Sequence, residues 1–128
     1  MTPMRVGWLF LVVVSVLAST GCGDDSDDES PAVTKCHDFA QSWCSETIGC
    51  FVTLGKLAES ERARNVDVCY DTAVAAAQCK RAVQIGATYN QCLSDISTMD
   101  CARWDVPEDQ LSTVTAPATC NGVILIAN

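Results

Sequence analysis

Nine cysteines are the residues of this 128-residue chain with the most distinctive chemistry. Zinc and iron–sulfur sites are usually built on Cys-x-x-Cys pairs, and the closest cysteines here, Cys44 and Cys50, are further apart than that. Thiol redox catalysis and c-type haem attachment also begin from Cys-x-x-Cys, which the sequence lacks. We therefore expect no metal site and no cofactor, and we assign the cysteines to other roles.

Hydrolytic catalysis by Ser or Cys needs a histidine as general base, and the chain has a single candidate, His37. The G-x-S-x-G sequence of hydrolases is absent, and His37 falls at the edge of the apolar face of an expected helix. The carboxylates that could act in pairs on a glycosidic bond fall on expected polar helix faces, at Asp38, Glu46, Asp67, Asp71 and Asp95. Solvation accounts for these carboxylates, so we predict no catalytic residues and no enzymatic activity.

An apolar run near the amino terminus, VGWLFLVVVSVLA at residues 6–18, indicates export. It follows the basic Arg5 and has about a dozen residues, the size of the apolar region of a secretory signal peptide and short of the roughly 20 that cross a bilayer. Polar residues begin directly after Ala18. A signal peptide therefore fits the pattern better than an uncleaved membrane anchor.

The next four residues, STGC at 19–22, indicate how the signal peptide is removed. They resemble the lipobox of bacterial lipoproteins, in which a small residue precedes a cysteine that is acylated and becomes the new amino terminus. The resemblance implies a signal peptide over residues 1–21 and a lipid such as palmitate on Cys22 that holds the protein on a membrane. The alternative is ordinary signal-peptidase cleavage after Ala18, with Val16 and Ala18 as the small-residue signature.

Counting the cysteines supports the lipid on Cys22 independently of the motif. An exported protein with an odd number of cysteines would keep one reactive thiol in an oxidising compartment. With Cys22 acylated, four disulfides can form among the remaining cysteines, Cys36, Cys44, Cys50, Cys69, Cys79, Cys92, Cys101 and Cys120. Such a density of disulfides is typical of small exported domains.

The segment after Cys22, GDDSDDES at residues 23–30, is acidic and has no apolar side chain that could join a core. Its like charges repel, so we expect residues 22–30 to form an extended, solvated tether. A calcium site would need an alternating Asp/Asn loop with a central Gly and a closing Glu, which the segment lacks. In bacterial lipoproteins, Gly23 in place of an acidic residue implies sorting to the outer membrane.

One domain remains, residues 31–128, and the charge of the chain excludes two classes of partner. The formal net charge is −8, with 8 basic and 16 acidic side chains. Nucleic acids and anionic membrane surfaces are bound by clustered Lys and Arg, so we expect neither as a partner. The whole chain resembles the small cysteine-rich lipoproteins of Gram-negative bacteria, which implies a location in the cell envelope.

The clearest element is an amphipathic helix in VTKCHDFAQSWCSETIGC, residues 33–50. Thr34, or Ser30 followed by Pro31, can start this helix, and Gly49 can end it. The apolar positions recur at spacings of three and four, at Cys36, Phe39, Ala40, Trp43, Cys44, Thr47 and Ile48. Both cysteines and both aromatic residues of this set are therefore expected in the core.

A second helix is expected over residues 65–85, because its alanines favour a helix and Gly86 is a natural stop. Its apolar side carries Val66, Cys69, Ala73, Ala76, Ala77 and Val83. If the second helix packs antiparallel on the first, Cys69 faces Cys44 and, further along both helices, Cys79 faces Cys36. The sequence therefore predicts the disulfides Cys44–Cys69 and Cys36–Cys79.

A third helix is expected after Thr88, because Thr88 and Gln91 fit a capping box. The apolar side of this helix carries Cys92, Ile96 and Met99. The four cysteines not yet paired, Cys50, Cys92, Cys101 and Cys120, allow three pairings, and the sequence does not choose among them.

The tail, residues 101–128, is expected to be irregular. Pro107 and Pro117 interrupt it, Asn-Gly at 121–122 suggests a turn, and the apolar run at 123–126 could form a strand-like segment on the helices. We therefore predict an all-α fold, a small disulfide-stapled bundle of about three helices with an irregular C-terminal tail.

Two non-enzymatic functions fit this chain. The first is an extracytoplasmic interaction or structural module, held rigid by its disulfides, with binding residues in the less regular segments 51–64 and 102–119. The second is a carrier of a small apolar ligand, since the pattern is similar to that of plant lipid-transfer proteins, in which helices and eight cysteines surround an apolar cavity. The sequence does not name the protein partner or the ligand.

Overall fold

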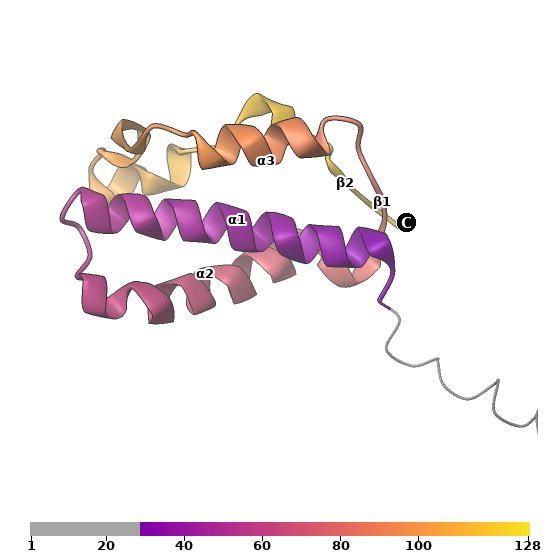
Figure 1. The fold of residues 1–128 in the computed structure, drawn as a ribbon, viewed down its shortest axis with the longest axis horizontal. Coiled ribbons are helices and arrows are strands. Elements are labelled where there is room, and N and C mark those ends of the chain that lie inside the picture. Colours follow the sequence, from indigo (N-terminus) through magenta and orange to yellow (C-terminus); the bar gives the residue numbers. More distant parts are fainter. Residues whose placement is uncertain (1–28) are drawn as a thin grey trace, which may run out of the picture.

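The computed structural model describes residues 29–128, which form a bundle of three α-helices with a two-stranded sheet. The helices are α1 (Pro31–Thr53), α2 (Arg62–Ala76) and α3 (Tyr89–Ser97), and the strands are β1 (Ala82–Ile85) and β2 (Ile124–Ile126). α1 lies between α2 and α3 (Figure 1). The predicted all-α, disulfide-stapled bundle is confirmed. The predicted signal peptide, the lipid site at Cys22 and the tether up to residue 28 lie outside the described residues.

Ser30 caps the N-terminus of α1, because its side-chain oxygen accepts a hydrogen bond of 3.3 Å from the Val33 backbone N–H, and Pro31 is the first helical residue. Of the two predicted starts, the one at Ser30 is confirmed. The predicted end at Gly49 is wrong, because the helix continues past Gly49 and the chain reverses at Gly55, where φ is +73°. A glycine costs a helix only about 1 kcal/mol, which the packing of the following turn outweighs.

α2 packs antiparallel on α1, and two disulfides join these helices. Cys36 is bonded to Cys79 and Cys44 to Cys69, with Cα–Cα distances of 5.4 and 5.6 Å. Both pairings predicted from the antiparallel arrangement are confirmed. The predicted extent of the second helix is wrong, because α2 begins before residue 65 and ends at Ala76.

The backbone at Gln78 marks the end of α2, because this residue adopts left-handed angles (φ 53°, ψ 45°). A 3-10 turn at Cys79–Arg81 then carries the chain into β1, so residues 82–85 form a strand. Val83, expected on the buried side of a helix, is 61% exposed, and Ala76 is also exposed. Pairing with β2, a segment far along the chain, outweighs the local helix propensity here.

β1 and β2 pair in antiparallel fashion, with Ala82 opposite Ile126 and Ile85 opposite Ile124. The strand-like segment expected near the C-terminus is therefore confirmed as β2. Gly86, expected to stop a helix, lies where the sheet closes, and a Cβ there would be 2.7 Å from the Gly122 carbonyl oxygen. This close approach of two backbones requires glycine.

α3 forms where it was expected, but the predicted capping box is absent. The Thr88 hydroxyl donates to the Thr119 carbonyl oxygen at 2.8 Å, and the Gln91 side chain donates to Asp95 at 2.8 Å. Thr88 therefore joins the start of α3 to the tail, whereas Gln91 bonds within α3, and neither side chain caps the helix. Of the predicted apolar side, Cys92 and Ile96 are fully buried, whereas Met99 is partly buried beyond the end of the helix.

The tail contains three turns of 3-10 helix, Cys101–Trp104, Glu108–Thr113 and Ala118–Cys120, so its predicted irregularity is confirmed. The turn expected at residues 121–122 is also present, with φ +70° at Gly122. In Figure 1 the first two turns pack at the end of the bundle opposite the sheet and the C-terminus. The tail thus runs along the bundle and covers α3 on its way back.

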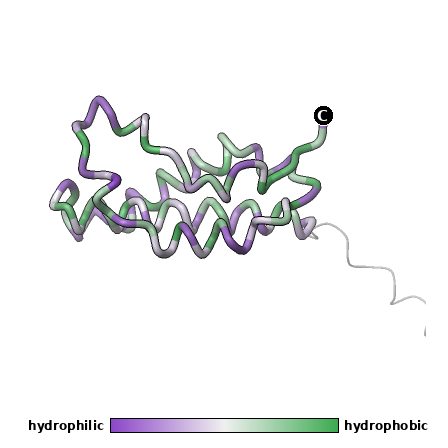
Figure 2. The backbone as a smooth tube through the Cα atoms, turned by 90° about the horizontal axis from the view of Figure 1, so that it is seen from above, coloured by the Kyte–Doolittle hydropathy of each residue, from purple (hydrophilic) through white to green (hydrophobic). Residues whose placement is uncertain are grey.

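Cystines and aromatic side chains fill the space between the helices. One cluster of buried residues contains Tyr89, Cys92, Ile96, Cys120 and Val123, and the partly buried Phe39 and Trp43 pack against it. A second cluster contains Ala32, Cys36, Cys79 and Ala82. Hydrophobic and hydrophilic residues alternate along the helices, as expected when each helix buries one face (Figure 2).

Candidate functional site

The two disulfides that the sequence left open attach the tail to the helices. Cys50, in the last turn of α1, is bonded to Cys101 with a Cα–Cα distance of 5.0 Å. Cys92 in α3 is bonded to Cys120 with a Cα–Cα distance of 4.7 Å. The first of these bonds holds the start of the tail against the C-terminal end of α1.

Three aromatic side chains form a cluster beside the Cys50–Cys101 disulfide. The ring of Trp104 lies 5.5 Å from that of Trp43 and 5.4 Å from that of Phe51, between ring centroids. Trp104 is 4% exposed. Its indole Nε1 and the Thr47 hydroxyl, one turn of α1 from both partner rings, are buried and have no hydrogen-bond partner within the described chain. The three rings pack together between the C-terminal half of α1 and the start of the tail, and we call this cluster the platform.

Lys56, just after α1, holds the tail over this platform. Its ammonium group donates to the Trp104 carbonyl oxygen at 2.8 Å and to the Val106 carbonyl oxygen at 2.7 Å. Each bond has a charged donor, which makes it stronger than a neutral hydrogen bond. Lys56 and the Cys50–Cys101 disulfide thus fix the position of residues 101–106 from two directions.

A pocket of about 530 Å³ opens where these segments meet, and we call it the tail pocket. It is lined by Phe51, Lys56, Val106, Pro107, Glu108 and Leu111. These residues come from both segments that the sequence suggested for binding, 51–64 and 102–119. The folded chain brings the two segments together into one mainly apolar surface, which the sequence did not predict.

Acidic residues lie in and next to the segment that lines the tail pocket: Glu108 is in its wall, and Asp105 and Asp109 adjoin the lining residues Val106 and Glu108 in the sequence. We call these three residues the rim. Asp105, Glu108 and Asp109 are exposed, and their carboxylates have no hydrogen-bond or ion-pair partner among residues 29–128. Nearby, by contrast, Arg62 and Glu59 form an ion pair of 2.7 Å, which lowers the pKa of the Glu59 carboxyl. The negative charge of the three rim carboxylates is not neutralised by an ion pair and can therefore attract a partner protein.

A second hollow, of about 460 Å³, lies where α2 ends, toward the start of α1. It is lined by Asp71, Val74, Ala75, Gln78, Cys79, Lys80 and Arg81. The Arg81 guanidinium is already occupied, because it donates to the Gln78 side chain at 2.6 Å and to the Ala127 carbonyl oxygen. These bonds hold the C-terminal end of the chain in place. The charged group of Arg81 in this hollow therefore serves the fold.

His37 lies at the edge of the buried face of α1, as expected, and links α1 to its neighbours. Its Nδ1 lies 2.6 Å from the Tyr70 hydroxyl on α2, and its Nε2 lies 3.4 Å from a carboxylate oxygen of Glu29. The second contact has the distance of an ion pair but fails the geometry of a hydrogen bond. In these contacts His37 faces neither a serine nor a thiol.

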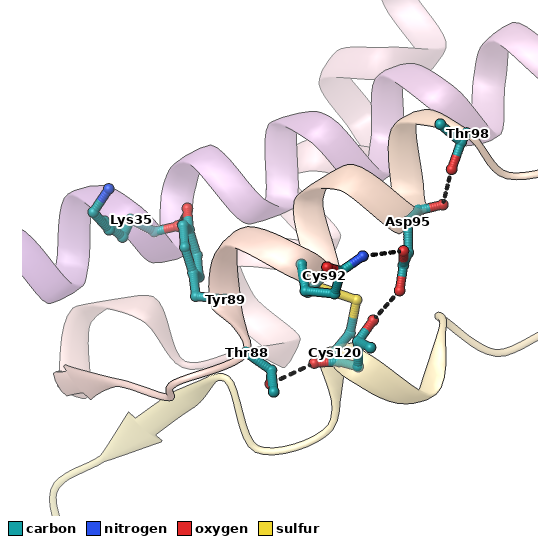
Figure 3. Close-up of a disulfide and its surroundings, with 9 residues drawn as sticks. Lys35, Thr88, Tyr89, Cys92, Asp95, Thr98 and Cys120 are labelled. Carbon is teal, nitrogen blue, oxygen red and sulfur yellow. Dashed lines mark hydrogen bonds between the residues drawn. A yellow bond between two sulfur atoms is a disulfide. The ribbon is translucent and has the colours of Figure 1, made fainter.

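Of the five carboxylates weighed for catalysis, Asp38, Asp67 and Asp71 are exposed, whereas Glu46 and Asp95 are partly buried. Asp95 accepts hydrogen bonds from Thr119 at 2.6 Å and from Gln91 at 2.8 Å, beside the Cys92–Cys120 disulfide (Figure 3). The bonds from Thr119 and Gln91 lower the pKa of the Asp95 carboxyl. Asp95 is thus a structural link between α3 and the tail.

Tyr89, at the start of α3, is another buried titratable group with a structural contact. Its hydroxyl donates to the Lys35 carbonyl oxygen at 2.7 Å, and the Lys35 ammonium lies 5.2 Å from the ring centroid. Burial, and secondly the charge of Asp38, raise the pKa of Tyr89. These contacts join the start of α3 to the first turns of α1.

Within residues 29–128 no three His, Cys, Asp or Glu side chains are arranged to hold a metal ion. None of the helices in this part of the chain is both long and apolar enough to cross a membrane. Comparisons of the sequence and the structure with protein-family models, curated proteins and solved structures found no match.

Proposed function

We propose that this protein is a lipoprotein of the bacterial cell envelope, anchored through Cys22, that binds an apolar segment of another protein in the tail pocket. The observation that carries the proposal is the position of this pocket. α1 begins at Pro31, directly after the acidic segment, and the tail pocket lies at the other end of the same helix. A lipid on Cys22 would therefore attach the chain at the end of α1 that is far from the pocket and leave the pocket open to a partner.

The dimensions of α1 support this arrangement. The helix has 23 residues, which at about 1.5 Å per residue gives a length of about 35 Å. Disulfides at Cys36, Cys44 and Cys50 attach other segments at three levels along α1. The helix is thus a braced spacer between the tether and the pocket, as suits a module that presents one surface outward.

The apolar-ligand carrier is the second candidate, and the volume of the tail pocket favours it because small-molecule pockets have similar volumes. Two observations favour the interaction module over it. Buried cystines and Ile96 fill the space between the helices, where a lipid-transfer protein has its cavity. The tail pocket is instead at the surface, with the exposed Lys56 and Glu108 in its wall.

The test is site-specific photocrosslinking of the full chain in intact Gram-negative cells. A photoreactive amino acid is placed at Leu111 in the pocket or, as a control, at the exposed Thr72 on α2. We expect a protein adduct at Leu111, none at Thr72, and loss of the adduct when Val106→Asp is added. Equal adducts at both positions, or none at Leu111, would contradict the interaction module, and an adduct of lipid mass at Leu111 would favour the carrier.

The anchor is tested separately by the intact mass of the protein extracted from membranes with detergent. An acylated chain that starts at Cys22, with eight alkylatable thiols after reduction and none before, is the expected result. A chain that starts near Ser19, with a ninth cysteine free or bonded to a second chain, would contradict the lipid anchor.

A further inference from the structure

The charges around the tail pocket limit the chemistry of its occupant. Glu108 lines the pocket, and Asp105 and Asp109 lie in the same short segment. All three are exposed, and none of them has an ion-pair or hydrogen-bond partner in the part of the chain that the structure describes. Three unpaired carboxylates close to an apolar pocket favour a cationic partner.

The basic residues nearby in sequence leave this negative charge unpaired. The Lys56 ammonium is directed to two backbone carbonyl oxygens, and the Arg103 guanidinium donates to the Thr115 carbonyl oxygen at 2.9 Å. Arg62 is paired with Glu59. Bonds to carbonyl oxygens leave Lys56 and Arg103 charged, but they hold both groups in the fold of the tail, and neither forms an ion pair with Asp105, Glu108 or Asp109. The three carboxylates outnumber these two cations, so the net charge around the pocket is negative.

We propose that the occupant of the tail pocket is a peptide segment in which an apolar side chain is flanked by Lys or Arg. This inference rests on the proposed function and adds the chemistry of its partner. The apolar side chain enters between Phe51, Val106 and Leu111, and the flanking cations meet Glu108 and its acidic neighbours at the rim. Fatty acids and anionic lipid headgroups carry the same sign of charge as the rim and are disfavoured there.

The experiment measures the binding of three fluorescent hexapeptides by polarisation. The protein is the full chain isolated with its anchor in phosphatidylcholine nanodiscs, whose lipid has no net charge. The peptides are Ac-GRLLRG, Ac-GQLLQG and Ac-GELLEG, which share the apolar pair and differ in the flanking charge. We expect the Arg peptide to bind about fivefold more tightly than the Gln peptide at low salt, with the difference shrinking at about 0.5 M salt.

Two double variants that change the charge equally separate the rim from the general acidity of the protein. Glu108→Gln with Asp109→Asn removes two rim carboxylates, and Asp67→Asn with Asp71→Asn removes two exposed carboxylates of α2. We expect the first variant, which keeps Asp105, to lose most of the preference for the Arg peptide and the second to keep the fivefold preference. An equal loss of preference in both variants would overturn the inference, because the attraction would then be nonspecific.

The outcomes also separate this inference from the function on which it rests. If the Arg and Gln peptides bind the unmodified protein equally, the inference fails while the apolar pocket stands. If the Glu peptide binds best, the inference is reversed. If none of the peptides binds and Leu111 gives no protein adduct in cells, the interaction module itself fails.

Discussion

Asp95 shows how a single residue ties two segments together. Its carboxylate accepts hydrogen bonds from Thr119 in the tail and Gln91 in α3, which hold its pKa below the ordinary value (Figure 3). We predict that Thr119→Val raises the pKa of Asp95, because the hydrogen bond that lowers this pKa most is lost. The measurement is an NMR titration of the Asp95 side-chain carboxyl.

The sign of the pH effect follows from the lowered pKa of Asp95. An acid whose pKa is lower in the folded state stabilises the fold above its unfolded pKa, and that stabilisation is lost as the pH falls through the folded pKa. The stability difference between the original protein and Thr119→Val should therefore shrink on acidification. Thr113→Val, which removes a hydroxyl bonded to the Gln110 carbonyl oxygen, is the control and should leave the Asp95 titration unchanged.

Lys56 is a second residue whose effect can be measured alone. We predict that Lys56→Met lowers the free energy of unfolding by about 1 to 3 kcal/mol, because the Trp104 and Val106 carbonyl oxygens lose a charged donor. Chemical denaturation with the disulfides intact measures this change. Lys80→Met is the matched control, since Lys80 is exposed and its ammonium has no hydrogen-bond partner within residues 29–128. Equal losses in the two variants would refute the role given to Lys56.

At the scale of elements, Gln78 separates α2 from the 3-10 turn and β1. It is the one non-glycine residue of the described chain with a positive φ, and left-handed backbone costs such a residue about 1 to 2 kcal/mol. We predict that Gln78→Gly is more stable than Gln78→Ala by about 1 kcal/mol. Both variants lose the side-chain bond to Arg81, so their difference in unfolding free energy isolates the backbone. If the alanine variant were equally stable, the left-handed turn would not limit stability.

Periodicity identified the helices better than it identified their ends. The spacing of apolar residues around Cys36 and Cys44 was enough to predict α1, because this helix buries one face along its whole length. It failed at residues 82–85, which continue an alanine-rich helical pattern yet pair with β2. Pairing with a strand that is distant in the sequence produces no local periodic pattern. The helix predicted over residues 65–85 therefore extends beyond the observed end of α2 at Ala76.

At the scale of the whole molecule, disulfides at opposite ends of α1 should have separable effects. Cys50–Cys101 closes a sequence separation of 51 residues and Cys36–Cys79 one of 43. Chain entropy then predicts a loss of about 4 kcal/mol for removing either bond. We predict that replacing Cys50 and Cys101 by alanine also abolishes peptide binding, because this bond holds the tail over the platform of the tail pocket.

The Cys36→Ala, Cys79→Ala double variant is the control for that experiment. Denaturation should give a similar loss of stability for both double variants, while polarisation should show that the control still binds the Arg-containing peptide. Loss of binding in both would mean that the pocket depends on global stability. Retention of binding without Cys50–Cys101 would mean that Lys56 and the aromatic cluster hold the tail without it.

The sequence by itself determined the class of the fold and two of its four disulfides. Apolar spacing identified the helices, and the levels of Cys36, Cys44, Cys69 and Cys79 on two antiparallel helices identified two disulfides, because these features depend on local geometry. It also singled out both segments that form the tail pocket, since they lack regular periodicity.

Only the tertiary structure decided what depends on contacts between distant segments. The pairing of Cys50 with Cys101 and of Cys92 with Cys120 follows from the path of the tail around the bundle, which has no periodic pattern. The same path brings Phe51 and Leu111 into one pocket and turns residues 82–85 into a strand. An irregular chain can close many loops at nearly equal entropic cost, so packing and hydrogen bonds such as those of Lys56 select the one observed.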